Sequence, residues 1–214
     1  METIMIYKSM KAIDAYLCRL FVGMVLLVMG FANECNAIAV TLGDQDFTDG
    51  YIIAGAAAFN VVSVGEPAPF DCVRGDDNGD PFSESWTFNY SPLNNITDAT
   101  LILGIVDNDS ASPGSQLNSF TVDSIDITSV LNDLFESHGG KQGECNVYTV
   151  NLPASTFSAL SDGTATFALT LQGTNLQSGN GACLDFATLT VVPEPGTMLL
   201  LCTGGLAAMR RRRT

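Results

Sequence analysis

The chain has 214 residues, of which 23 are acidic and 9 are lysine or arginine, giving a formal net charge of -14. This excess of negative charge argues against nucleic acid as a partner, because the phosphate backbone would repel the protein. A single histidine and the absence of Gly-x-Ser-x-Gly and His-Glu-x-x-His motifs leave few groups for catalysis, so we expect no enzyme activity.

The chain begins with a segment typical of secretory signal peptides. An apolar run at 21–31 follows three basic residues and precedes small residues around Ala37. We therefore expect residues 1–37 to be a signal peptide, with translation starting at either Met1 or Met10. Removal of this segment leaves an exported domain over 38–192, a length suited to one domain. That domain has nineteen acidic residues against only Arg74 and Lys141.

Short β-rich runs separated by Gly, Pro, Asn, Asp and Ser clusters dominate this domain. One run alternates clearly, with Phe167, Leu169 and Leu171 on one face and Thr166 and Thr170 on the other. The run at 101–106 is apolar on both faces, which indicates a central strand. The predicted strands are 51–54, 85–90, 100–106, 120–127, 147–152, 164–171 and 186–192.

Two short helices are expected among these strands. The first starts at Thr128 or Ser129 and ends at Gly139, and the second covers 155–160. Such helices are too few for βαβ crossovers, so the sequence predicts an all-β fold: an antiparallel, jelly-roll-like β-sandwich. A signal helix at the N-terminus and a short transmembrane helix at the C-terminus would flank it.

Carboxylates after the central strand suggest a metal site. Asp107 and Asp109 would lie one pleat apart on the same side and repel each other unless a cation lay between them. Asp185 shares a predicted strand face with apolar residues, so its charge needs a partner, and Asp126 could complete the site. The sequence thus predicts calcium bound by Asp107, Asp109, Asp126 and Asp185. An ordinary polar turn with side-chain to backbone hydrogen bonds explains the Asp107–Asp109 pattern equally simply.

The exported domain contains three cysteines, Cys72, Cys145 and Cys183, which cannot all pair with one another. In an oxidising compartment we expect a disulfide between Cys145 and Cys183, which would join two late strands. A bridge between Cys72 and Cys145, or three free thiols, are the alternatives.

The C-terminal tail is the most specific feature. It begins with Pro193, Glu194 and Pro195, continues with a mostly apolar stretch at 198–209, and ends with four arginines before Thr214. The prolines should keep the motif extended and clear of the domain before it. The apolar stretch is a marginal membrane span, and Arg210, Arg211, Arg212 and Arg213 would act as a membrane stop on the cytoplasmic side.

This order of features resembles the PEP-CTERM sorting signal of bacterial surface proteins, over about a tenth of the chain. The resemblance implies that an exosortase, a membrane transpeptidase, cuts near the motif. The protein would first be held at the inner membrane by its C-terminal helix and then reach the cell surface or extracellular matrix.

Three functions fit this organisation. The first is a non-enzymatic surface or matrix protein that acts in adhesion or matrix structure, with calcium as a cofactor. The second is a carbohydrate-binding module for matrix polysaccharide, with Trp86, Tyr90 and Tyr148 as stacking rings. The third is an ice-binding protein, since some of those carry a similar tail, and the sequence has Thr-x-Thr pairs at 164–166 and 188–190.

Overall fold

The structure is a computed structural model that describes residues 36–53, 65–106, 108, 115–138, 143–173 and 178–194. Residues 36–194 form one compact unit. The predicted signal peptide, the apolar tail and the four terminal arginines lie outside the described residues. Among the helices that are described, none has the length and apolar character needed to cross a membrane.

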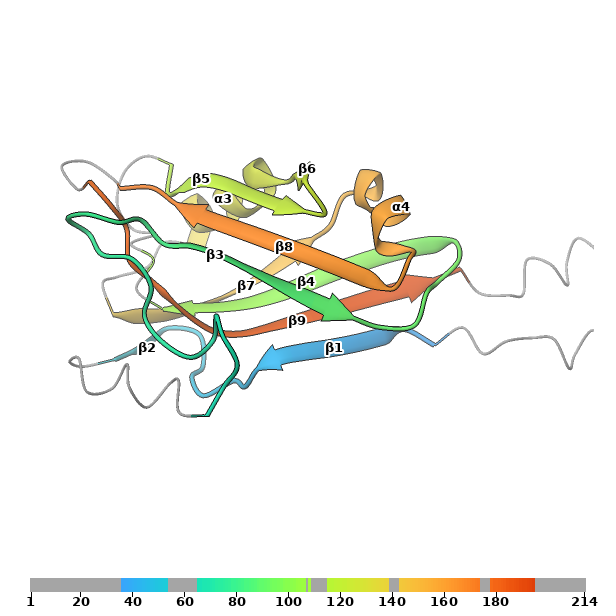
Figure 1. The fold of residues 1–214 in the computed structure, drawn as a ribbon, viewed down its shortest axis with the longest axis horizontal. Helices are drawn as coiled ribbons and strands as arrows, with labels where there is room; N and C mark the ends of the chain where they lie inside the picture. The colour runs from blue at the N-terminus through green and yellow to red at the C-terminus, as the bar shows by residue number, and fades with distance from the viewer. Residues whose placement is uncertain are drawn as a thin grey trace, which may run out of the picture. The chain divides into compact units, whose positions relative to one another are not determined.

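Five strands form the larger sheet (Figure 1), and every neighbouring pair is antiparallel. The central position of β4 agrees with the apolar run predicted there. In order across the sheet the strands are β1 (Ile38–Gly43), β9 (Cys183–Pro193), β4 (Ile96–Val106), β7 (Glu144–Asn151) and β2 (Tyr51–Ile52).

The second sheet has the order β3 (Ser83–Asn89), β8 (Thr164–Leu171), β5 (Leu117–Val122) and β6 (Ile125–Asp126), again antiparallel. The single strand expected at 120–127 is therefore wrong in one respect, because β5 and β6 form a hairpin. Asp123 and Ser124 have positive φ angles of 48° and 67° and make its turn. Both residues thus occupy the left-handed region, which asparagine, aspartate and glycine favour.

Two short helical segments join the strands, as expected. α3 (Thr128–His138) packs against β5 and β7, and buries Leu131 and Phe135. The second segment is a 3₁₀ turn, η1 (Ala154–Thr156), that continues into α4 (Phe157–Leu160). α3 contacts β7 of the larger sheet and β5 of the smaller one, and α4 contacts β4 and β8, so each helix touches both sheets.

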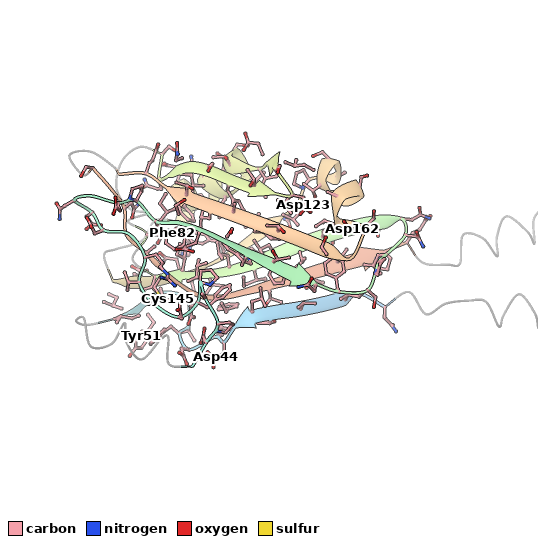
Figure 2. The ribbon with its side chains drawn as sticks, viewed as in Figure 1. Asp44, Tyr51, Phe82, Asp123, Cys145 and Asp162 are labelled. Carbon is pink, nitrogen blue, oxygen red and sulfur yellow. The ribbon has the colours of Figure 1, made fainter. Side chains whose placement is uncertain are left out.

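The inner faces of the two sheets share one apolar core. Phe167 lies at its centre, stacked on Trp86 and Phe120 with ring centroids 5.9 and 5.8 Å apart. Phe82, labelled in Figure 2 just before β3, enters the same core and is fully buried. The fold is thus mostly β, with two antiparallel sheets and two short helices, which confirms the predicted class at this level.

Candidate functional site

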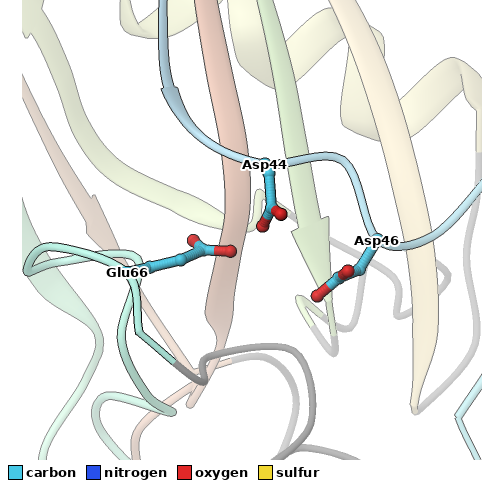
Figure 3. A group of neighbouring side chains, drawn as sticks. All are labelled: Asp44, Asp46 and Glu66. Carbon is cyan, nitrogen blue, oxygen red and sulfur yellow. The ribbon is translucent and has the colours of Figure 1, made fainter.

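Three carboxylates gather where β1 ends. Asp44 and Asp46 follow the strand directly, and Glu66 approaches from a later segment of the chain. One oxygen from each lies within 4.8 Å of the other two. Figure 3 shows the Glu66 and Asp44 carboxylates pointing toward one another, with Asp46 beyond Asp44. We call Asp44, Asp46, Glu66 and the adjacent Asp185 the carboxylate cluster.

Asp185 lies beneath this group, in a β-bulge. Leu184 pairs with Ile105 and Phe186 pairs with Gly104, so Asp185 is the extra residue of β9. The bulge breaks the alternation from which we expected Asp185 to share a face with later apolar residues. Its fully buried carboxylate accepts long hydrogen bonds from the N–H groups of Asp46 (3.3 Å) and Phe47 (3.4 Å).

Burial raises the pKa of Asp185 to about 6, even though these two backbone N–H groups oppose the shift. The negative charges of Asp46 and Asp44 add to the increase. Burial likewise raises the pKa of Asp46, with a further contribution from Asp44. Ionising these carboxylates in the folded protein therefore costs free energy, and a bound cation would lower that cost.

Glu66 is the most perturbed member. Desolvation, followed by a hydrogen bond to the Asp44 carboxylate, raises its pKa to about 8. Its Oε2 atom is buried, and no donor reaches it in the described part of the chain. Two ionised carboxylates that face one another repel, and a shared proton, a bridging water or a cation between them would relieve this repulsion.

Gly43 makes this approach possible. Its φ is +70°, and an added Cβ would overlap the Asp185 carbonyl oxygen and come within 3.0 Å of Glu66 Oε2. Glycine, which has no side chain, adopts this left-handed conformation readily. The chain can therefore turn at the end of β1 and pass over the Asp185 bulge.

The cluster offers only oxygen atoms, which favours calcium or magnesium over softer metals. Calcium binds its oxygen ligands at about 2.4 Å, so two ligands of the same ion are at most about 4.8 Å apart. The oxygens of Asp44, Asp46 and Glu66 meet this limit. This spacing is what one calcium ion would require of three ligands, although Asp44 and Asp46 are exposed and such acidic groups are common without an ion.

Of the ligand set predicted from the sequence, the structure describes only Asp126 and Asp185, and these two lie in different sheets. Asp107 and Asp109 lie outside the described residues. Asp126 lies on β6 in the four-stranded sheet, whereas Asp185 lies on β9 in the other. Asp126 is exposed and accepts bonds from the Thr128 N–H (2.9 Å) and hydroxyl (2.6 Å), which lower its pKa. Asp126 therefore acts as a hydrogen-bond acceptor for the first residue of α3.

Sequence reasoning missed Asp44, Asp46 and Glu66. A glycine followed by two acidic residues at i and i+2 was a visible signal at 43–46. Nothing in the sequence placed Glu66 beside them, because that proximity is a tertiary contact between residues about twenty positions apart.

The expected disulfide between Cys145 and Cys183 is not formed, and both are free, buried thiols. Each pairs directly with Val106, from opposite sides of β4. Two strand spacings separate their Cα atoms by about 10 Å, whereas a disulfide needs less than about 7 Å. Burial raises the pKa of each thiol to about 12, which makes both unreactive.

The rings proposed for carbohydrate stacking are mostly inside the core. Trp86 is 4% exposed and Tyr148 is 2% exposed. Tyr148 packs on Phe135, and Tyr90 donates its hydroxyl proton to the Leu160 carbonyl (2.6 Å). Trp86 and Tyr148 therefore present no face to a sugar.

The first two residues of the sorting motif belong to the folded domain. Pro193 is buried and is the last residue of β9, opposite Ile96 of β4. The Glu194 N–H donates to the Asn95 carbonyl (2.6 Å). We expected the motif to stand clear of the domain, and for these two residues that expectation is wrong. Pro195 lies outside the described residues.

A pocket of about 380 Å³ lies beside this strand end. Residues 93–96, Phe157, Ser158 and Ser161 line it. It and the carboxylate cluster lie toward opposite ends of β9, since eight residues separate Asp185 from Pro193, or about 26 Å of strand. In Figure 2, Asp162, next to Ser161 in the chain, lies far from Asp44.

Comparison with known proteins identifies the tail. Residues 191–213 match the model of the PEP-CTERM protein-sorting motif. No curated protein matches the chain. Among solved structures, the chain matches part of dimeric latent PorU from Porphyromonas gingivalis, with 11% identity and a TM-score of 0.36. That alignment covers 75% of this chain but only 13% of PorU.

Proposed function

We propose that this chain, which carries a PEP-CTERM sorting motif, is a non-catalytic protein of the cell surface or extracellular matrix whose acidic domain acts in adhesion or matrix structure. The motif implies export, processing by an exosortase and sorting to the cell surface. The observation that carries the proposal is the match over 191–213, which begins in the last three residues of β9 and continues into the tail.

The direct test is processing of the full-length chain in a bacterium that contains an exosortase. We expect a size shift and recovery of the domain in the surface fraction. Replacement of Pro193, Glu194 and Pro195 by alanine should abolish both. Recovery of the triple variant on the surface at the original level would contradict the proposal.

We also infer the finer architecture, a jelly roll. The order β1-β9-β4-β7 in one sheet faces β3-β8-β5-β6 in the other. From β3 onward the chain changes sheet at each step except the β5–β6 hairpin. This exchange of strands supports a doubled Greek key.

Calcium at the carboxylate cluster is part of the proposal. Support comes from the three converging carboxylates, from the buried Asp185 and from Glu66 Oε2, which lacks a donor. Since a ligand that binds only the folded state raises its stability, 5 mM calcium should increase the melting temperature by a few degrees at a Kd near 0.5 mM. Thermal melts with calcium and with chelator measure this shift.

Glu66→Gln should remove most of the calcium-dependent increase, because it deletes a ligand charge. Glu136→Gln, an equivalent change at an exposed position of α3, should retain it. An equal calcium response in both variants, or no response in the unmodified protein, would argue against calcium at this cluster.

One observation favours ice binding as a second candidate. On the outer face of the larger sheet, Thr41 pairs with Thr188 and Thr190 pairs with Thr100, and the Thr41 and Thr188 hydroxyls are 2.8 Å apart. Neighbouring positions in these two rows are Ala39, Ile102, Thr149 and Asn151, so the rows contain no charged residue. Spacings of about 4.8 Å across strands and about 6.8 Å along them make a regular hydroxyl array.

Thermal hysteresis of the purified protein tests this candidate. If the array binds ice, Thr188→Lys should abolish the hysteresis, because a long charged side chain would interrupt the flat face. Ser137→Lys, at an exposed site on α3, should preserve it. An unmodified protein without hysteresis would exclude ice binding.

A further inference from the structure

The start of the sorting motif, where the domain joins its tail, is held against the surface of the domain. Pro193 and Glu194 are held by β4 and by the turn before it, through the Ile96 pairing and the 2.6 Å hydrogen bond to Asn95. Asn95 has a positive φ of 54°, which belongs to the turn that leads into β4. A strand register and a backbone hydrogen bond therefore fix the start of the motif against the domain.

An enzyme that grips the Pro-Glu-Pro segment must also meet this surface. Three extended residues span only about 10 Å, and two of the three are bound to the domain. The protein around an active site is wider than that distance. Contact with the neighbouring turn and with α4 is thus a geometric consequence of where the motif lies.

The pocket beside the motif is suited to such a contact. All its lining residues, 93–96, Phe157, Ser158 and Ser161, are uncharged, although the domain is strongly acidic. The exposed side-chain amides of Asn94 and Asn95 make no hydrogen bond in the described part of the chain. They can therefore bond to a partner.

The charged groups near its margin are carboxylates: Asp98, exposed on β4 opposite Val192, and Asp162 and Glu194. Asp162 follows Ser161, but its carboxylate is engaged by the Thr164 N–H and hydroxyl, both at 2.8 Å. Glu194 belongs to the motif itself. The uncharged lining itself adds no repulsion when the acidic domain approaches an anionic membrane, where a membrane-embedded enzyme works.

We propose that this sandwich rim, formed by residues 93–96 and by Phe157, Ser158 and Ser161, is a docking surface for the membrane transpeptidase that processes the tail. The enzyme then recognises the folded end of the domain together with the motif. This inference rests on the proposed function, because it requires that the tail is processed.

The test uses the full-length chain in a bacterium that contains an exosortase, with pulse-chase electrophoresis to follow the processed fraction. Ser158→Arg places a long charged side chain in the pocket and should slow processing at least fivefold. Ser155→Arg is the matched control, since Ser155 is exposed on the adjoining 3₁₀ turn but does not line the pocket. It should be processed at the original rate.

A second variant avoids any effect of Ser158→Arg on folding. Six Gly and Ser residues inserted between Val192 and Pro193 keep the motif intact but move it up to about 20 Å from the rim. Processing should again slow at least fivefold. Processing of this variant at the original rate or faster would overturn the inference.

The alanine replacement of Pro193, Glu194 and Pro195 separates the two failures. If it abolishes processing while the insertion does not slow it, the docking surface is wrong and the sorting function stands. If the alanine variant is still processed, the sorting function fails, and the docking surface fails with it.

Discussion

Individual carboxylates in this protein differ because of their surroundings. Asp126 and Asp162 are exposed and accept bonds from a nearby threonine, which lowers their pKa. Asp185 and Glu66 are desolvated by burial and lie among like charges, and their pKa values rise although backbone hydrogen bonds oppose the shift. Acidic residues thus accept local hydrogen bonds at some positions, and at another they form a group of carboxylates that is costly to ionise.

The raised pKa values of Asp185 and Glu66 predict an unusual pH dependence of stability in the absence of calcium. For both groups the folded-state pKa lies above the unfolded one, so the folded domain binds protons more strongly. That stabilisation is complete below about pH 4, and it is lost as the pH rises through about 6 for Asp185 and about 8 for Glu66. In chelator, the melting temperature should fall between pH 5 and pH 8.5.

Glu66→Gln should flatten the upper part of this pH profile, since glutamine does not titrate. Glu136→Gln provides the comparison at an exposed site. Thermal melts across the pH range in chelator are the measurement. A melting temperature that climbs steadily from pH 5 to pH 8.5 would contradict the proposed cost of ionising the cluster.

The cysteines give a second prediction at this scale. Because Cys145 and Cys183 are two strands apart, the exported domain should titrate three thiols when unfolded without reductant. In the folded domain, Cys72 should react first, since the other two are fully buried. Detection of a single thiol in denaturant would show that a disulfide forms after all.

At the scale of elements, the β4–β9 pair is the most informative. An added Cβ at Gly104 would lie 2.5 Å from the Phe186 ring, at the site of the bulge that isolates Asp185. The glycine makes room for this ring on the outer face of the sheet. The bulge and the glycine together therefore set the position of Asp185.

Gly104→Ala should consequently destabilise the domain by about 1–3 kcal/mol through overpacking. Combining it with Phe186→Leu should recover part of the loss, because the smaller side chain leaves space for the methyl group. Urea denaturation of both variants and of Thr100→Ala, on the same strand, measures the effect. A neutral Gly104→Ala would mean that the ring moves away freely.

The strands themselves were largely predictable. The alternation of apolar and hydroxyl residues gave β8 with the bounds that the structure shows, 164–171. β1 was missed, because it directly follows the expected signal peptide and lies at a sheet edge, where burial is incomplete. The break between β5 and β6 was missed because β-rich residues continue through a turn that aspartate and serine can also adopt.

At the scale of the whole molecule, charge is the dominant property. Residues 38–192 include nineteen acidic residues and only two basic ones. Arg74 is held between Asp71 (2.6 Å) and Glu84 (3.6 Å), so part of this scarce positive charge serves a local contact. The remaining acidic residues repel one another in the folded state more than in an expanded chain.

Monovalent salt should therefore stabilise the domain. The Debye length falls from about 30 Å at 0.01 M to about 10 Å at 0.1 M and 3 Å at 1 M, so the repulsion is progressively screened. We expect the melting temperature in chelator to rise by several degrees from 0.01 to 0.5 M sodium chloride. An insensitive melting temperature would indicate that the charges are too far apart to matter.

The sequence by itself determined the C-terminal sorting motif, the acidic character and the β class, because these depend on local composition and on periodicity along the chain. Tertiary structure alone decided which carboxylates meet, which cysteines are out of reach, and that Pro193 and Glu194 are bound to the domain. Those facts depend on strand order, a single bulge and a returning loop, which bring residues together that are far apart in sequence.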